Sequence, residues 1–257
     1  MLEIRNLTKR FRGAPVVDDV SFAVRPGEIT GYLGPNGSGK STTVKILTGL
    51  LHATSGHVLY QGQDIFHDTI AFRQRLGYVP EEPNLYGYLT GLEYLQLAGG
   101  LRGLPSNMVT RRANQLLDLL YLHEARWLAI GNYSKGMKQR VLIAAALLHD
   151  PDVLIFDEAQ SGLDITNSLL FRHLLRELAA RGKVVLYIAC TGVGRKDLRP
   201  HRGHRPRPHR SRRLRGAPAD ITATAEPGGS LHAACASGRF GVESPGDNFR
   251  PHSAMTH

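Results

Sequence analysis

The residues from Gly34 to Thr43 carry the most specific chemistry in this 257-residue chain, because they fill every fixed position of the phosphate-binding pattern G-x-x-x-x-G-K-[ST]. Glycine backbone can turn its N–H groups toward phosphate oxygens where a Cβ would clash. We predict that Lys40 reaches the β- and γ-phosphates of a nucleoside triphosphate and that Ser41 ligates Mg²⁺. A glycine-rich turn without a ligand is the alternative. The residues expected to contact the nucleotide are Gly34, Pro35, Asn36, Gly37, Ser38, Gly39, Lys40, Ser41 and Thr42.

Two carboxylates, Asp157 and Glu158, follow the apolar run Val153–Phe156. Acids at the end of a buried strand lie where open α/β sheets place their ligand chemistry. We predict that Asp157 holds Mg²⁺ and that Glu158 orients or deprotonates the attacking water. The alternative is a pair of solvated acids that open a turn.

A second anion site is predicted at Ser134, which precedes a helical pattern running from Lys135 to Leu148. Serine is a favoured N-cap residue, and the first N–H groups of a helix point toward an anion. An ordinary capped helix without a ligand is the alternative.

The elements that must position these residues follow from apolar patterning. Strands are predicted at residues 2–7, 20–24, 27–33, 56–60, 153–156 and 184–188. The last two are wholly apolar, as in strands buried on both faces of a parallel sheet. One helix is predicted to start at Ser41, and apolar residues three and four apart predict helices near 92–97 and 114–122. The fold class is therefore α/β, with a nucleotide-binding core and a mostly helical insertion at about 84–150.

Composition narrows the classes of protein that fit. The formal net charge is +10, but residues 189–257 hold 12 of the 32 Lys and Arg and only five of the 22 Asp and Glu. Only Cys190 and Cys235 occur, so neither a disulfide framework nor a zinc cluster is indicated. The start lacks the apolar core of a secretion signal, and the apolar run Val141–Leu148 is too short to span a membrane, so a cytosolic location is expected.

Two further motifs make the chain resemble a known family. Ser161–Asp164 reads S-G-L-D after the paired acids, and Asn132–Arg140 reads N-Y-S-K-G-M-K-Q-R before them. Residues 1–188 resemble ATP-binding cassette proteins, which carry a signature like L-S-G-G-Q, an Asp-Glu strand end and an S-G-L-D loop in that order. The variant signature, with Gly77–Tyr86 and Leu89–Leu95, is most similar to ATPase subunits of multidrug, antibiotic-resistance and polysaccharide exporters.

The resemblance implies a phosphate-loop NTPase core at about 1–83 and 151–188, with a mixed, mainly parallel sheet flanked by helices. It adds an antiparallel β subdomain and makes residues 84–150 the helical signature subdomain. ATP and Mg²⁺ are the implied cofactors. Each ATP would lie between two chains of a homodimer or heterodimer, in contact with Lys40 of one chain and with the signature of the other. The further implied contacts are Phe11 on adenine, Ser134, Lys135, Gly136, Met137 and Asp164 on the nucleotide, and Glu81 on Mg²⁺.

Two of these positions carry a qualification. An isolated Phe beside a strand is often a core residue, so core packing of Phe11 is the alternative to adenine stacking. Glu81 stands where most of the family has Gln, although a carboxylate can also ligate Mg²⁺. A separate transmembrane permease is the implied partner, which would place the chain in the cytoplasm at the inner face of the cell membrane. No specific nucleic acid is expected.

The family's switch histidine is missing after the strand predicted at 184–188, where the sequence continues Ala189-Cys190-Thr191 and has no His before His201. We interpret residues 189–257, rich in Arg, Pro and His, as an out-of-frame and unstructured tail. Codons permitted for residues 197–204 and 226–231, shifted by one nucleotide, can spell I-C-D-R-T-V-V-I and S-L-E-E-V-F, which resemble exporter sequence. The alternatives are a basic arm for nucleic acid or lipid, a hydrolysis-deficient remnant, and a cassette ATPase acting on DNA or RNA.

Overall fold

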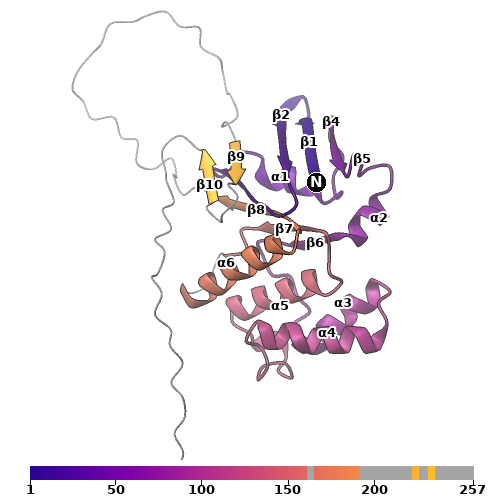
Figure 1. The fold of residues 1–257 in the computed structure, drawn as a ribbon, viewed down its shortest axis with the longest axis vertical. Coiled ribbons are helices and arrows are strands. Elements are labelled where there is room, and N and C mark those ends of the chain that lie inside the picture. Colours follow the sequence, from indigo (N-terminus) through magenta and orange to yellow (C-terminus); the bar gives the residue numbers. More distant parts are fainter. Residues whose placement is uncertain (161–164, 191–221, 226–230, 235–257) are drawn as a thin grey trace, which may run out of the picture.

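The computed structural model describes residues 1–160, 165–190, 222–225 and 231–234 (Figure 1). Its centre is a parallel sheet in the order β3-β8-β7-β6. These strands point the same way, so their carboxyl ends share one edge of the sheet. The strands are β3 (Ile29–Gly34), β8 (Val184–Cys190), β7 (Val153–Asp157) and β6 (Leu76–Val79).

An antiparallel sheet forms the upper part of the molecule in Figure 1. Its order is β2-β1-β4-β5, with β1 (Leu2–Phe11) paired to both β2 (Ala14–Val24) and β4 (Ser55–Tyr60). The short β5 (Gln63–Asp64) pairs with β4 and forms one edge of this sheet. Helix α1 (Lys40–Leu47) shares one apolar core with residues of both sheets, which fixes the phosphate loop between them.

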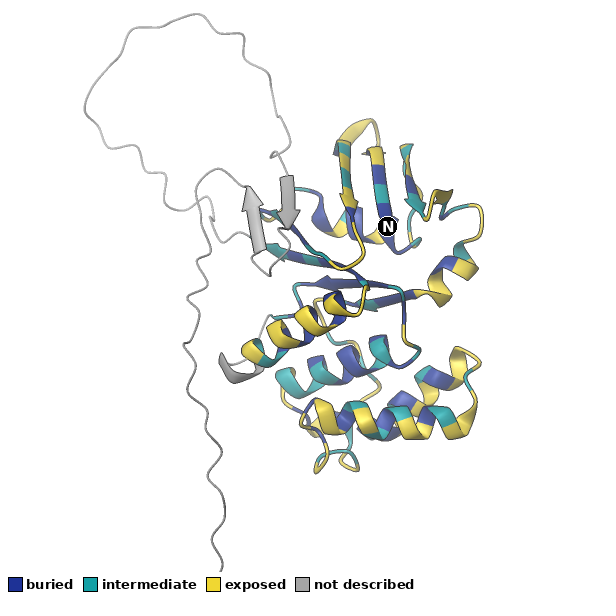
Figure 2. Cartoon of the chain, in the orientation of Figure 1, coloured by how far each residue is buried: buried dark blue, intermediate teal, exposed yellow. Residues whose placement is uncertain are grey.

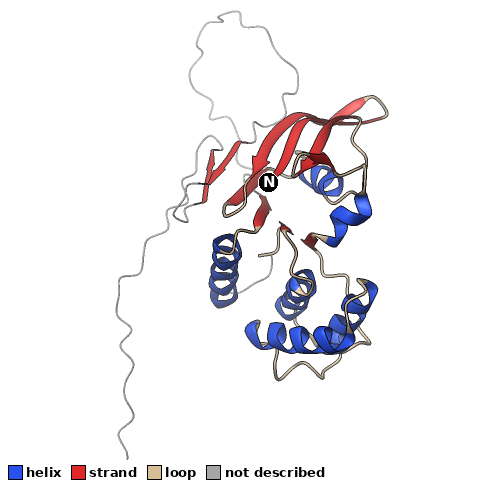
Figure 3. Ribbon diagram, turned by 45° about the vertical axis from the view of Figure 1, so that its right-hand side comes forward, coloured by secondary structure: helices blue, strands red, loops and turns tan. Residues whose placement is uncertain are grey.

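Helices cover the other face of the parallel sheet. Figure 3 shows α3 (Gly91–Leu101), α4 (Ser106–Leu119) and α5 (Lys135–Leu147) grouped apart from the antiparallel sheet. Their apolar faces form a second core with residues of β7, and Figure 2 shows α4 buried on one side and exposed on the other. The remaining helical elements are α2 (Thr69–Gln74), the 3-10 helix η1 (Ile130–Asn132) and α6 (Ile165–Ala180).

The predicted fold class is confirmed, including the mainly parallel core, the antiparallel β subdomain and the helical subdomain. The helix expected at 114–122 begins earlier, at Ser106. It ends at Leu119, because the backbone turns at Tyr121, where φ is 53°. Strand β8 continues to Cys190, past the boundary expected at 188. In the region interpreted as the tail, β9 (Thr222–Ala225) pairs antiparallel with β10 (Leu231–Ala234), and the rest of 191–257 lies outside the described residues.

Candidate functional site

The phosphate loop connects β3 to α1, as the sequence predicted. Gly39 is the N-cap residue of α1 with φ 91°, and a Cβ there would lie 2.4 Å from the carbonyl oxygen of Val16. Only glycine fits this conformation at this distance from β2. Among the described residues, no side chain caps α1 at Gly39, so the first N–H groups of the helix are left to an anion.

Lys40 is a buried cation, with 6% of its surface exposed. Its ammonium donates hydrogen bonds to the carbonyl oxygens of Gly34, at 2.9 Å, and Pro35, at 3.1 Å. The ion pairs found among the described residues do not include Lys40. A buried ammonium is costly unless an anion compensates its charge, so this arrangement fits a bound phosphate.

The hydroxyl of Ser38 supports the same interpretation. Its oxygen is buried and has no hydrogen-bond partner in the part of the chain that the structure describes. A Cβ added to Gly34 would lie 2.6 Å from that oxygen, so the loop closes tightly around it. Buried hydroxyls are normally satisfied, and a phosphate oxygen would supply the missing partner.

Asp157 and Glu158 lie at the same edge of the sheet as the phosphate loop. Asp157 ends β7 opposite Ile188 of β8, and Gly34 ends β3 opposite Cys190 of the same strand. Glu158 has a left-handed backbone with φ 46°, and its N–H donates to the carbonyl of Ile188 at 3.0 Å. Such strain in a non-glycine residue clusters at functional sites.

The surroundings of Asp157 raise its pKa to about 6. Burial is the largest cause, and the negative charges of Glu81 and Glu158 add to it, while Lys40 and a hydrogen bond with Tyr78 act in the opposite direction. The carboxylates therefore repel one another, and a cation among them would relieve that repulsion. The oxygen donors of Asp157, Glu81 and Ser41 are of the type that Mg²⁺ prefers, so these residues fit the ion.

Phe11 is 47% exposed, so core packing of this residue is ruled out. It ends β1 at the hairpin to β2, whose Val16 carbonyl faces Gly39 of the phosphate loop. The ammonium of Lys9 lies 5.2 Å from the centroid of the Phe11 ring. An exposed ring beside the loop is available to stack on a base, and that role stays a prediction.

The predicted second anion site lies at the start of α5. Ser134 is the N-cap residue, and its hydroxyl accepts a hydrogen bond from the backbone N–H of Met137 at 3.2 Å. Ser134 and Lys135 are exposed, whereas Gly136 and Met137 are half-buried. Figure 1 shows α5 on the opposite side of the parallel sheet from α1, so one chain holds the two predicted anion sites apart.

Two parts of the predicted site lie outside the described residues. These are Asp164, with the Ser161–Asp164 loop, and the position of the missing histidine beyond Cys190. Cys190 itself donates a hydrogen bond from Sγ to Oδ1 of Asn36 at 3.1 Å. The end of β8 therefore touches the phosphate loop.

Sequence reasoning missed two tyrosines near the acids. Tyr78 hydrogen-bonds to Asp157, and burial, followed by the charge of Asp157, raises the pKa of Tyr78 to about 12. Burial, followed by the charge of Glu158, raises the pKa of Tyr187 to about 12. Each tyrosine stands in an otherwise apolar strand, and that was the available signal, because a buried hydroxyl there usually has a polar partner.

Comparisons with known proteins agree with this geometry. A model of the ABC transporter family matches residues 17–161. The chain is 42% identical over 178 residues to the uncharacterized ABC transporter ATP-binding protein YxlF of Bacillus subtilis, covering 69% of this chain and 59% of YxlF. It is 40% identical over 185 residues to Nod factor export ATP-binding protein I of Burkholderia lata, covering 72% of this chain and 61% of that protein. The chain thus spans less than two thirds of the length of these relatives.

A solved structure shows the same fold. The dimeric post-hydrolysis state of the ATP-binding cassette MJ0796, bound to ADP and Pi, is similar with a TM-score of 0.68 and 26% identity, covering 74% of this chain and 88% of that one. Fold and site define a nucleotide-binding protein with a phosphate loop. The chain belongs to the ABC transporter family, as an ATP-binding protein. In the part of the chain that the structure describes, no helix combines the length and apolarity needed to cross a membrane.

Proposed function

We propose that the chain is the ATP-hydrolysing subunit of an exporter, which dimerises on ATP and drives a separate membrane permease. One observation carries the proposal. The buried ammonium of Lys40, bonded only to neutral carbonyls among the described residues, lies at the sheet edge that also carries Asp157 and Glu158. A cation suited to phosphate beside carboxylates that can hold Mg²⁺ and activate water meets the requirements for hydrolysing a triphosphate.

The chain's own residues divide this chemistry among them. The N–H groups at the start of α1 and the ammonium of Lys40 hold the phosphates, while Phe11 stacks on adenine. Ser41, Asp157 and Glu81 would hold Mg²⁺, which neutralises phosphate charge when bound. Glu158 orients the attacking water and accepts its proton.

In the proposed ATP-dependent dimer, the start of α5 binds the nucleotide of the other chain. Ser134, Lys135, Gly136 and Met137 contact the nucleotide held by the second chain, since α1 and α5 lie on opposite sides of the parallel sheet (Figure 1). The similar MJ0796 cassette, solved as a dimer with ADP and Pi, supports this arrangement. Asp164 completes the nucleotide contacts in the proposal.

An exposed aromatic surface on the helical subdomain is the proposed docking site for the permease. Tyr86 and Tyr88 are 54% and 78% exposed, with ring centroids 5.9 Å apart. Trp127 is 69% exposed on a second segment, which a β-bridge between Thr90 and Ala129 joins to the first. Exposed aromatic groups of this kind mark interaction sites, and a cytoplasmic segment of the permease would cover them. The chain would then work at the cytoplasmic face of the membrane.

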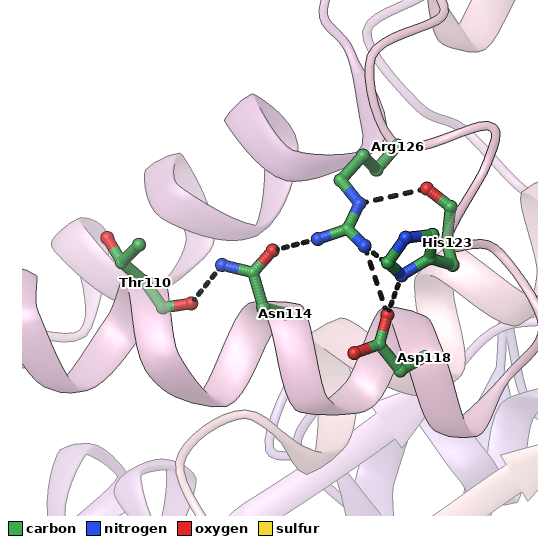
Figure 4. Close-up of polar contacts among 5 residues, drawn as sticks. All are labelled: Thr110, Asn114, Asp118, His123 and Arg126. Atoms are coloured by element: carbon green, nitrogen blue, oxygen red, sulfur yellow. Dashed lines mark hydrogen bonds and ion pairs between the residues drawn. The ribbon is translucent and has the colours of Figure 1, made fainter.

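The polar network in Figure 4 holds the segment that carries Trp127. Arg126 donates to the carbonyl of His123 at 2.8 Å and to Oδ1 of Asn114, and it forms an ion pair with Asp118 at 3.2 Å. His123 also pairs with Asp118. These contacts tie the loop after α4 back onto α4, so the aromatic surface rests on a fixed segment.

Export is the proposed direction of transport, because Nod factor export ATP-binding protein I is among the similar relatives. Turnover is proposed to be slow, since the sequence has no histidine between Ile188 and His201, where the family places its switch histidine. The second candidate function rests on the same observation. It is an ATP-binding protein deficient in hydrolysis, with residues 189–257 read out of frame.

Glu158→Gln tests the assignment. The amide keeps the shape of the side chain but cannot accept a proton, so MgATP should bind with unchanged affinity while hydrolysis is lost. The variant should also form an ATP-dependent dimer, measured by light scattering. Calorimetric binding and steady-state phosphate release on the purified chain separate the candidates: a parent that binds MgATP and hydrolyses it is the ATPase, and one that only binds it is the deficient form. Hydrolysis by Glu158→Gln at the parental rate would contradict the role of Glu158.

A further inference from the structure

A buried amide connects the two nucleotide contacts of one chain. Gln139, in the first turns of α5, is 0% exposed, and its Nε2 donates a hydrogen bond to the carbonyl of Pro80 at 3.2 Å. Pro80 immediately precedes Glu81. The helix that begins at Ser134 is therefore bonded to the loop that carries the proposed Mg²⁺ ligand.

Stability alone does not account for this glutamine. Its Oε1 is buried and has no hydrogen-bond partner among the described residues. A buried polar atom without a partner destabilises the folded state, and an apolar side chain of similar shape is often neutral or stabilising in its place. A buried amide whose acceptor oxygen is unused is better explained by a role in holding the Pro80 carbonyl in place.

The contact lies at one end of a close packing between α5 and β6. At the other end, a Cβ on Gly77 would lie 2.6 Å from the carbonyl oxygen of Ala146, so helix and strand touch directly. From Gln139 to Ala146 the helix rises about 10.5 Å, and from Gly77 to Pro80 the strand extends about 10 Å. The two lengths match, so the helix contacts the strand at both of these points.

We propose that Gln139 is a positioning residue, which couples the start of α5 to Glu81 and so links the nucleotide bound by one chain to its contact with the nucleotide of the other. The coupling rests on the proposed function. When Ser134 engages the partner's ATP, a displacement of the start of α5 carries the Pro80 carbonyl with it, and Glu81 moves relative to Asp157. Without the amide, the loop and the helix adjust independently.

Gln139→Met tests the coupling. The thioether fills a similar volume. It removes the unpaired Oε1 but also the donor to the Pro80 carbonyl, so the two effects offset each other and thermal stability should stay close to that of the parent. The Mg²⁺ concentration for half-maximal ATP binding, followed by calorimetry on the full chain, should rise about five- to tenfold. In a Glu158→Gln background, the ATP concentration needed for dimerisation should rise by a similar factor. A merely structural role would weaken the nucleotide response only together with thermal stability, so a weaker response at parental stability supports the coupling.

Gln115→Met is the matched control, because Gln115 is exposed on α4 in the same subdomain. It should leave the Mg²⁺ dependence and dimerisation unchanged. Gln139→Leu guards against a packing defect specific to methionine, and all measurements are made below the unfolding transition. Parental Mg²⁺ dependence and dimerisation in both Gln139 variants, while the parent binds MgATP, would overturn the coupling alone. A parent that binds no MgATP overturns the proposed function and the coupling with it.

Discussion

The starts of α1 and α5 are the two regions whose comparison explains most about this molecule. Helix α1 begins after Gly39, which has φ 91° and offers no side chain to cap the helix. Helix α5 begins after Ser134, whose hydroxyl accepts from the N–H of Met137 at 3.2 Å. One helix leaves its first N–H groups to a ligand, and the other satisfies one of them itself. The first thus suits a ligand held by its own chain, and the second can fold fully before any partner arrives.

The lysines beside the two helix starts also differ in burial. Lys40 beside the first is 6% exposed and bonded to carbonyls, whereas Lys135 beside the second is exposed. Buried cations bind anions strongly because little water competes, while exposed ones are screened. We therefore expect affinity for ATP to depend on the start of α1, and dimerisation to depend on the start of α5.

Lys40→Met gives the largest effect expected from this comparison. It removes the buried ammonium while keeping most of the side-chain volume, so ATP affinity should fall by roughly a hundredfold or more. Lys45→Met is the control, because Lys45 is an exposed lysine of the same helix and should bind ATP like the parent. Calorimetric titration of both variants with MgATP decides. Equal affinity of the two would show that the buried position of Lys40 has no part in binding.

Ser134→Ala should have an intermediate effect, and a selective one. Losing the cap should lower stability by about 1 kcal/mol. Thr90→Ala removes an equivalent cap from α3, where Thr90 and Glu93 form a capping box, so it should cost a similar amount. Only Ser134→Ala should weaken ATP-dependent dimerisation, by about five- to tenfold, while the monomer binds ATP as before. If Thr90→Ala weakens the dimer equally, loss of helix stability explains both results.

The two helix starts could both be predicted from the sequence, but the contact between their regions could not. The start of α1 could be predicted because its glycines and Lys40 form a local pattern, and the strand β7 because the apolar run Val153–Phe156 is typical of a strand buried on both faces. Local pattern also located Ser134 as a cap. What links these regions is not local: Gln139 forms its hydrogen bond with Pro80, 59 positions away in the chain.

One strand was missed for the same reason. Strand β6 is only four residues long and includes Gly77 and Tyr78, so no apolar run marked it. Its place in the sheet follows from pairing with β7 and from the close approach of Ala146 to Gly77. Tertiary packing, rather than residue type, determined this strand.

The smallest predicted effect concerns pH and contrasts the loop before β7 with the acids after it. Burial, followed by the positive charge of Arg102, lowers the pKa of His149 from 6.5 to about 4; Arg112 acts in the same direction, and Asp150 and a hydrogen bond with the Leu76 carbonyl in the other. The unfolded chain then binds the proton at higher pH than the folded one, so this contribution to stability is full above about pH 6.5 and is lost as the pH falls toward 4. Asp157, with its pKa raised to about 6, acts in the opposite direction, because the folded state binds its proton more readily.

His149→Gln separates these opposing contributions. The amide can donate to the Leu76 carbonyl that Nε2 of His149 contacts at 3.1 Å, but it does not titrate. The melting temperature of the parent should therefore fall more steeply between pH 6.5 and 4 than that of His149→Gln, with Asp157→Asn shifting the slope the other way. His52→Gln is the control, since His52 is exposed, whereas His149 is half-buried, and its ring contacts Phe66. Thermal unfolding of the four proteins at matched ionic strength provides the measurement, and identical slopes for the parent and His149→Gln would show that protonation of His149 is not linked to unfolding.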